Sequence, residues 1–177
     1  DNIEHCSCFV RKQPENLLAR VWDQEKMEKY QGDERLFMIG FSNNYHRLDE
    51  VREGRRSPAW QERFWLEQEK REAEIFNRLR RLGLRPVNGT DGGCGQTYFH
   101  ETWLELALLV ERCGLSEQEA IWAATVAGAE ALGLSGKAGR LTEGYDADLI
   151  TVRENPFRQI RALAKVEHVM RAGEVIR

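Results

Sequence analysis

Two kinds of hydrophobic pattern alternate along this chain of 177 residues. Short apolar runs predict a strand at 2–6 and a buried strand at 36–41, and a short extended segment before glycines predicts a third strand at 85–91. Apolar residues that recur three or four positions apart, or that fill a longer stretch, predict helices at about 14–30, 57–82, 100–112 and 117–132. Strands that alternate with helices in this order predict a parallel α/β sheet.

Local signals mark where several of these helices begin and end. Ser57-Pro58 suits a helix start, with serine as the N-cap and proline at the first helical position. Gly83 and Gly114 follow the last turns of two helices, where glycine commonly ends a helix. Ser116 and Glu119 have the spacing of a capping box, in which each side chain satisfies a backbone donor of the other.

The composition changes after Gly133. Residues 139–152 read as a turn that leads into a strand, and residues 166–176 read as two short strands folded about Ala172-Gly173. We therefore expect a small β element at the carboxyl end of an α/β body.

Composition and charge exclude several classes of protein. An apolar content of 41% is enough for the core of one domain, and a net charge of -3 with both signs interspersed leaves no basic surface for nucleic acid. We expect no membrane partner and a cytoplasmic location, because no apolar run reaches the roughly 18 residues of a membrane span and residues 1–5 lack signal-peptide features. Since Asp1 stands directly before a predicted strand, we also expect the chain to be the carboxyl portion of a longer protein.

The four cysteines do not indicate a metal knuckle or a disulfide framework. They stand at positions 6, 8, 94 and 113 and include a Cys-X-Cys but no Cys-X-X-Cys. Buried or incidental thiols are the better interpretation. Cys94 lies three residues after Asp91, but no basic neighbour is present to activate it as a nucleophile.

Asp91 has the most informative position of any polar residue. It ends the run Arg85–Asp91 and precedes Gly92-Gly93, so that a carboxylate stands where a predicted strand gives way to a permissive loop. α/β enzymes keep their chemistry at the carboxyl ends of strands. The alternative is a turn or N-cap role for Asp91 before the two glycines.

Five phrases, in order, resemble the metal-dependent amidohydrolase family, in the branch of imidazolonepropionase-like and dipeptidase-like enzymes. The phrases are Ile3-Glu-His5, Gly89-Thr-Asp-Gly92, His100-X4-Glu-Leu106, Gly114-Leu-Ser-X2-Glu-Ala120 with Ala123-Ala-Thr125, and Gly144-Tyr-Asp-Ala-Asp-Leu149 with Asn155-Pro156. Each phrase alone is weak, but the five together extend over nearly the whole chain in the family's order.

The resemblance implies a partial (β/α)8 TIM-type barrel. Residues 1–137 would form the carboxyl-terminal part of the barrel, with 2–6, 36–41 and 85–91 as its sixth, seventh and eighth strands. Residues 138–177 would contribute to a small β-sandwich that the family builds from both chain ends. Strands one to five would be missing, together with the metal ligands that they carry in the family.

The resemblance also implies roles for three residues. His5 and Asp91 would bind a divalent metal, expected to be zinc as one or two ions, and Asp91 would transfer the catalytic proton. His100 would lie near the substrate, although Glu101 stands where the family usually has glycine. The alternatives are a carbonyl-bonded structural role for His5 and a helix-opening role for His100. His46 and His168 are expected to be surface loop histidines.

Two functions remain open at this point. The first is a metal-dependent hydrolase that cleaves a C–N bond in an amide, cyclic amide or dipeptide-like small molecule. The second is a non-catalytic half-barrel that functions only with another chain, because three barrel strands alone leave open edges. The partner would be the missing amino-terminal half or a second copy of the chain.

Overall fold

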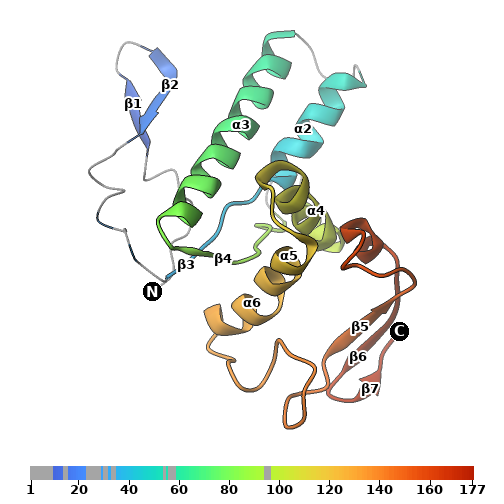
Figure 1. Ribbon diagram of the computed structural model, residues 1–177. Coiled ribbons are helices and arrows are strands. Elements are labelled where there is room, and N and C mark those ends of the chain that lie inside the picture. The colour runs from blue at the N-terminus through green and yellow to red at the C-terminus, as the bar shows by residue number, and fades with distance from the viewer. Residues whose placement is uncertain are drawn as a thin grey trace.

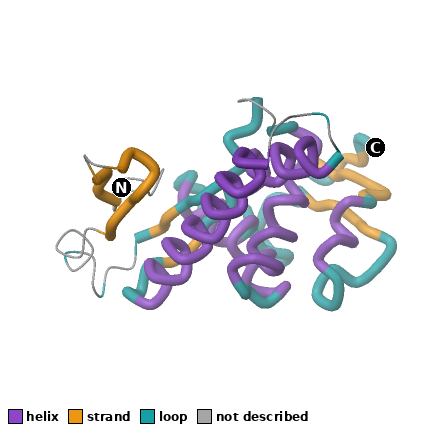
Figure 2. Tube along the Cα trace, turned by 90° about the horizontal axis from the view of Figure 1, so that it is seen from above, coloured by secondary structure: helices purple, strands orange, loops and turns teal. Residues whose placement is uncertain are grey.

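The computed structural model describes residues 10–13, 16–22, 29, 32, 35–53, 55, 59–93 and 97–177. The predicted strand at 2–6 and the predicted helix start at Ser57-Pro58 lie outside these residues. Helices make up the middle of the molecule, with an amino-terminal hairpin on one side and a carboxyl-terminal sheet on the other (Figure 1, Figure 2).

Strands β3 (Leu36–Phe37) and β4 (Arg85–Pro86) pair in parallel, with Leu36 opposite Arg85. The two segments stay together past the strand ends, because the amide N of Val87 donates to the carbonyl O of Phe37 at 2.9 Å. Parallel strands joined through helices confirm the predicted α/β class. Both strands are shorter than the predicted strands at 36–41 and 85–91, whose remaining residues belong to no strand.

Helix α2 (Ser42–Arg52) follows the β3 segment directly. It is absent from the sequence-based prediction, because Ser42-Asn-Asn44 is as typical of a turn as of a helix start. Helix α3 (Ala59–Arg81) is the long predicted helix and packs beside α2 (Figure 1). Gly83 follows it with φ 101°, a left-handed conformation that suits glycine. No helix in the described ranges is both long and apolar enough to cross a membrane.

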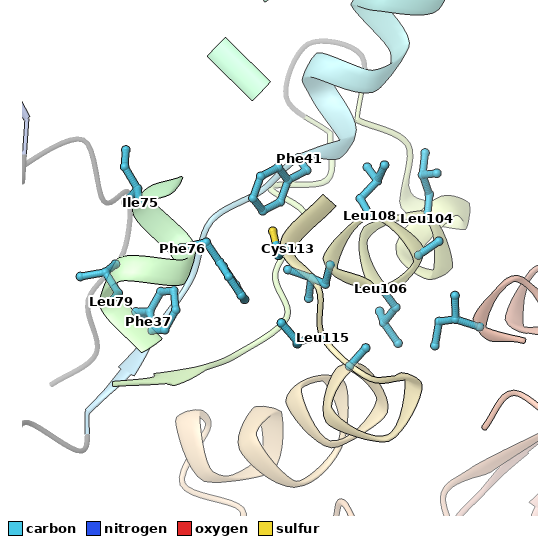
Figure 3. Close-up of a cluster of buried hydrophobic side chains, with 14 of the residues drawn as sticks. Phe37, Phe41, Ile75, Phe76, Leu79, Leu104, Leu106, Leu108, Cys113 and Leu115 are labelled. Atoms are coloured by element: carbon cyan, nitrogen blue, oxygen red, sulfur yellow. The ribbon is translucent and has the colours of Figure 1, made fainter. Parts of the chain in front are cut away.

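The hydrophobic core joins the β3 segment to α3 and to α4 (Thr102–Cys113) (Figure 3). Phe76 of α3 lies in this cluster, with ring centroids 5.1 Å from Phe37 and 6.2 Å from Phe41. Helix α4 is buried along most of its length, as its apolar sequence predicts, and Gly114 ends it with φ 71°. Cys113 is also buried, and burial raises the pKa of its thiol, so this cysteine is structural.

The alanine-rich stretch forms two helices, α5 (Glu117–Ala124) and α6 (Val126–Ala131). The predicted capping box is present, because the Ser116 Oγ accepts from the Glu119 amide and the Glu119 carboxylate accepts from the Ser116 amide. The single helix predicted at 117–132 is wrong at Thr125. Its backbone is distorted from ideal helical values, with φ -110° and ψ -77°, and its hydroxyl donates to the carbonyl O of Ile121 at 2.7 Å.

The carboxyl-terminal β element has the predicted layout. Strands β5 (Leu149–Val152), β6 (Val166–Arg171) and β7 (Glu174–Val175) form an antiparallel sheet in sequence order. The β6–β7 turn lies at Ala172-Gly173, where both residues have positive φ. A 3-10 helix, η3 (Ile160–Ala164), packs this part against α4.

The predicted helix at 14–30 is wrong over residues 16–22, and most of its remainder lies outside the described residues. Strands β1 (Val10–Gln13) and β2 (Asn16–Trp22) instead form an antiparallel hairpin. Leu17, Leu18, Val21 and Trp22 have helical spacing, but a run of seven residues is too short for periodicity to separate helix from strand. Pairing with the preceding segment decides the conformation.

Candidate functional site

The carboxyl ends of β3 and β4 lie side by side and carry the candidate site. A Cβ atom at Gly40 would lie 3.6 Å from the carbonyl O of Gly89, so the two segments run close together beyond their strands. At Gly89 a Cβ would meet the Met38 Sδ at 1.7 Å. Glycine at this position therefore lets the β4 segment pass under Met38 on the way to Asp91.

Asp91 lies on the same side of the sheet as the carboxyl end of β4, but five residues beyond the strand, which ends at Pro86 rather than at the predicted residue 91; its side chain is exposed. Its φ of 54° is left-handed, a conformation that is uncommon for residues other than glycine and that aspartate tolerates better than most. A turn at Gly92-Gly93 follows, and the Gly93 amide donates to the carbonyl O of Thr97 at 2.9 Å. The backbone thus holds an exposed carboxylate at the rim in an unusual conformation.

The ring of Phe99 packs over the turn after Asp91. A Cβ at Gly92 or Gly93 would come within 3.0 or 2.8 Å of this ring, so a side chain at either position would displace the ring from the turn. Phe99 is nevertheless 79% exposed. It belongs to the 3-10 helix η2 (Phe99–Glu101), which leads into α4.

A buried carboxylate holds the end of the β3 segment. The amide N of Phe41 donates to Glu105 Oε1 at 2.7 Å, and the amide N of Ser42 donates to Oε2 at 3.0 Å. Glu105 is 0% exposed. Burial raises its pKa to about 7, and the two backbone N–H bonds oppose that shift because they favour the ionised form.

His46 is a half-buried member of α2, so its expected place in a surface loop is wrong. Its Nε2 lies 2.6 Å from Glu101 Oε2, and each side chain is 21% exposed. The Tyr98 ring packs edge-on against the imidazole, with centroids 5.3 Å apart. The missed helix α2 explains the error, because that helix directs residue 46 inward.

His100 and His168 are both exposed. His100 lies in η2 at the rim, with its Nε2 3.9 Å from Glu101 Oε1, and its role in substrate binding remains a prediction. His168 is on strand β6 rather than in a loop, and its Nδ1 lies 2.9 Å from the Thr151 Oγ1. It belongs to the carboxyl-terminal sheet and not to the rim at Asp91.

The predicted metal ligands cannot be assembled from the described residues alone. No cluster of three or more His, Cys, Asp or Glu side chains suited to a metal ion occurs within the described ranges. Asp91 offers one carboxylate, and His5 and Cys94 lie outside those ranges. A protein zinc site commonly has three or four protein ligands, so the described rim does not by itself fit the ion.

The arrangement suits proton transfer and the binding of a polar small molecule. Asp91 supplies an exposed carboxylate, while Tyr98, Phe99 and His100 form an exposed aromatic edge beside it. Sequence reasoning missed Glu101, Glu105 and His46. One signal was available, because Glu101 and Glu105 stand four residues apart and so share a helix face.

Comparison with known proteins gives a family match over most of the chain. The model of the amidohydrolase family matches residues 63–176. The imidazolonepropionase of Kosmotoga olearia is 33% identical over 98 residues, which are 54% of this chain and 24% of that protein. The ochratoxinase of Aspergillus niger is 36% identical over 101 residues, 55% of this chain and 20% of that protein. The matched residues thus span a quarter or less of the length of these relatives.

Solved structures show the same likeness at the level of fold. A Xaa-Pro dipeptidase with methionine bound in its active site superposes with a TM-score of 0.73 at 23% identity, over 99% of this chain and 39% of that one. The A. niger ochratoxinase gives 0.70 at 24% identity, over 99% of this chain and 36% of that one. These neighbours are TIM-barrel proteins, and the chain has the α/β fold of part of such a barrel.

Proposed function

Because this chain belongs to the amidohydrolase family, we propose that it supplies the carboxyl-terminal part of a barrel that hydrolyses a carbon–nitrogen bond. The substrate class is an amide, cyclic amide or dipeptide-like small molecule. The observation that carries the proposal is the position of Asp91, an exposed carboxylate five residues beyond the carboxyl end of β4 and beside the turn at Gly92-Gly93. TIM-barrel enzymes keep their catalytic residues at this end of the strands.

In this proposal Asp91 moves the proton of the reaction. A water molecule adds to the substrate carbonyl carbon, and Asp91 takes a proton from that water. Asp91 then passes the proton to the leaving nitrogen as the C–N bond breaks, which yields a carboxylic acid and an amine. The left-handed backbone at Asp91 sets the direction in which the side chain leaves the main chain at the rim. His100, at the exposed edge, would contact the substrate.

The proposal includes a divalent metal, with zinc as the first candidate. Asp91 would give one oxygen ligand and His5 a nitrogen ligand, and the remaining ligands would come from barrel strands that precede residue 1 in the family's order. Such an ion, when bound, polarises a carbonyl and lowers the pKa of water. One or two ions are compatible with this ligand set.

The proposed position in the barrel assigns residues 2–6, 36–41 and 85–91 to the sixth, seventh and eighth strands. The parallel pairing of β3 with β4 supports neighbouring places for the last two. Residues 138–177 would complete the small β-sandwich, which the antiparallel β5–β7 sheet supports.

A half-barrel that acts only by association is the second candidate function. In the described ranges the parallel sheet contains two strands, so each strand has one side without a neighbouring strand. The partner would be a chain that supplies the other barrel strands or a second copy of this chain. Association alone would then be the role, without turnover.

The test combines this chain with the amino-terminal barrel segment of the Xaa-Pro dipeptidase that it does not cover, and measures hydrolysis of dipeptides and small amides. We expect Asp91→Asn to lower kcat/KM by at least about 100-fold. The matched control is Asp146→Asn, an exposed aspartate of the tail, which should leave activity unchanged. Equal activity of the Asp91 variant and the unaltered chain would remove Asp91 from the mechanism. A stable complex without turnover would favour the second candidate.

A further inference from the structure

Two carboxylates of one helix face reach the same neighbouring segment. Glu101 and Glu105 are four residues apart at the start of α4, and their partners, the Ser42 amide and the His46 imidazole, are four residues apart at the start of α2. The turn spacing of one helix therefore matches the turn spacing of the other. We call Glu101 and Glu105 the α4 carboxylate pair.

Glu105 places a carboxylate at the amino end of α2, a role that an acidic residue in the first turn of the helix itself usually has. The first amides of a helix have no partner within the helix, and a carboxylate placed there is favoured by the helix dipole. The first turn of α2 contains no acidic residue. The carboxylate comes instead from a residue 63 positions away in sequence.

Complete burial gives the Glu105 carboxylate a large desolvation cost as a partner for a helix end. A buried carboxylate loses its hydration, and a neutral residue of similar size avoids that cost. Glu72 of α3 and Cys113 of α4 also face this carboxylate, and the charge of Glu72 adds to the cost of ionisation. In return, the two carboxylate oxygens fix the orientation of two backbone amide groups at the end of the β3 segment.

The segment that Glu105 holds is continuous with the rim. Residues 38–40 run beside Gly89-Thr90, one step before Asp91. On the other side of the contact, Tyr98 packs on His46 and Phe99 packs on Gly92-Gly93. The segments beyond β3 and β4 thus meet directly before Asp91, and after Asp91 they are joined through Tyr98 and Phe99, which lead into α4.

We infer that Glu101 and Glu105 are positioning residues that hold the loop beyond β3 in one register against the loop beyond β4. They thereby keep His46 and Asp91 on a common rim. The register itself is a property of this chain, and only its importance for turnover rests on the proposed function.

The first experiment measures amide hydrogen exchange at Phe41 and Ser42 in the chain itself at pH 8. In Glu105→Gln one acceptor oxygen is replaced by an NH2 group that faces a backbone N–H, so exchange at these two amides should rise at least about tenfold. The core amides of α4 should stay protected. Glu111→Gln is the matched control, because Glu111 lies on the exposed side of the same helix and binds Arg161. Unchanged exchange at Phe41 and Ser42 would overturn the inference.

A second measurement needs no variant that could fail to fold. The backbone 15N shifts of Phe41 and Ser42 in the unaltered chain should titrate together with a midpoint near pH 7, which reports the ionisation of Glu105. The titration should persist in His46→Gln, which removes the imidazole of α2, and in Glu72→Gln, which removes the facing carboxylate of α3. Shifts that do not titrate, or that follow His46, would contradict the inference.

The second member of the pair has its own test. Glu101→Ala should abolish the nuclear Overhauser contact between the His46 and Tyr98 rings, while exchange at Phe41 stays slow. A contact that survives would remove Glu101 from the pair.

In the combined barrel, Glu105→Gln should lower kcat/KM about tenfold with Asp91 intact, and full activity there would show that the register has no bearing on turnover. A combined barrel without turnover would contradict the proposed function. The amide hydrogen exchange results would still test whether Glu105 holds the register.

Discussion

The two ends of the β3–β4 pair are both fastened by carboxylates, but in different surroundings. At the amino end, the guanidinium of Arg85 pairs with both oxygens of Glu130, and the two side chains are 36% and 38% exposed. At the carboxyl end, Glu105 is fully buried and accepts from two backbone amides. One end uses a solvent-exposed ion pair and the other a dehydrated carboxylate.

The difference shows which end needs a fixed geometry. An exposed ion pair contributes little to stability and tolerates change. A buried carboxylate costs more, and its benefit is position rather than stability. The costly contact lies at the carboxyl end of the pair, where barrel enzymes keep their chemistry and beyond which Asp91 lies. The contact of lower cost lies at the opposite end, where catalytic residues are not expected.

The largest expected effect is on the pH dependence of stability. The pKa of Glu105 is raised to about 7 from an ordinary 4.5, so its contribution to stability is fully present below pH 4.5 and is lost as the pH rises through about 7. The loss amounts to at most about 3 kcal/mol. Urea denaturation between pH 4.5 and 8 should show this decline, and Glu105→Gln should flatten it. A variant profile parallel to that of the unaltered chain would contradict the account.

Glu130 should behave in the opposite direction. Its hydrogen bond with Arg85 lowers the pKa of the carboxyl group, so its contribution is present above the ordinary pKa of 4.5 and is lost as the pH falls below that value. Comparing the Glu105→Gln and Glu130→Gln profiles therefore separates the two ends of the sheet in one set of denaturation curves.

A smaller effect is expected for Glu105→Gln at pH 5, where the native carboxyl is protonated. The amide NH2 then opposes a backbone N–H with no other acceptor, which should lower the free energy of unfolding by about 1–2 kcal/mol. Glu111→Gln is the control on the same helix and should change it by less than about 0.5 kcal/mol. An equal effect of both variants would mean that burial at residue 105 does not matter.

The His46–Glu101 contact should matter less, because it is only partly buried. Glu101→Ala should lower the free energy of unfolding by about 1 kcal/mol. His100→Ala removes a neighbouring but exposed imidazole and should have no measurable effect. Urea midpoints at pH 6 compare the two variants. A larger loss of stability for His100→Ala would mean that Glu101 holds His100 rather than His46.

The smallest effect belongs to the amino end. Glu130→Gln should lower the free energy of unfolding at pH 7 by less than about 0.5 kcal/mol. Salt at about 1 M should abolish the difference, because it screens exposed charges. A loss above that of Glu101→Ala would remove the contrast between the two ends.

Sequence reasoning recovered the features that depend on neighbours in the chain. The Ser116–Glu119 capping box, the glycine after α4 and the β6–β7 turn follow from residues a few positions apart. The strand that leads toward Asp91 was also predictable, although it ends at Pro86 rather than at residue 91.

The missed features depend on residues far apart in sequence. Glu105 resembles any buried-face glutamate until its partners 63 and 64 positions away are known. His46 could not be placed without α2, whose polar start is typical of a turn. The β1–β2 hairpin was missed because strand pairing overrode a short helical spacing.

The measurement that tests the central claim most directly is the distance between residues 5 and 91 in the folded chain. Spin labels on unnatural amino acids at these two positions leave the native cysteines in place. If His5 and Asp91 end barrel strands separated by one intervening strand, their Cα atoms lie about 10 Å apart and the labels should lie within about 20 Å. A distribution centred beyond about 30 Å would place the two residues away from a common rim and contradict the account.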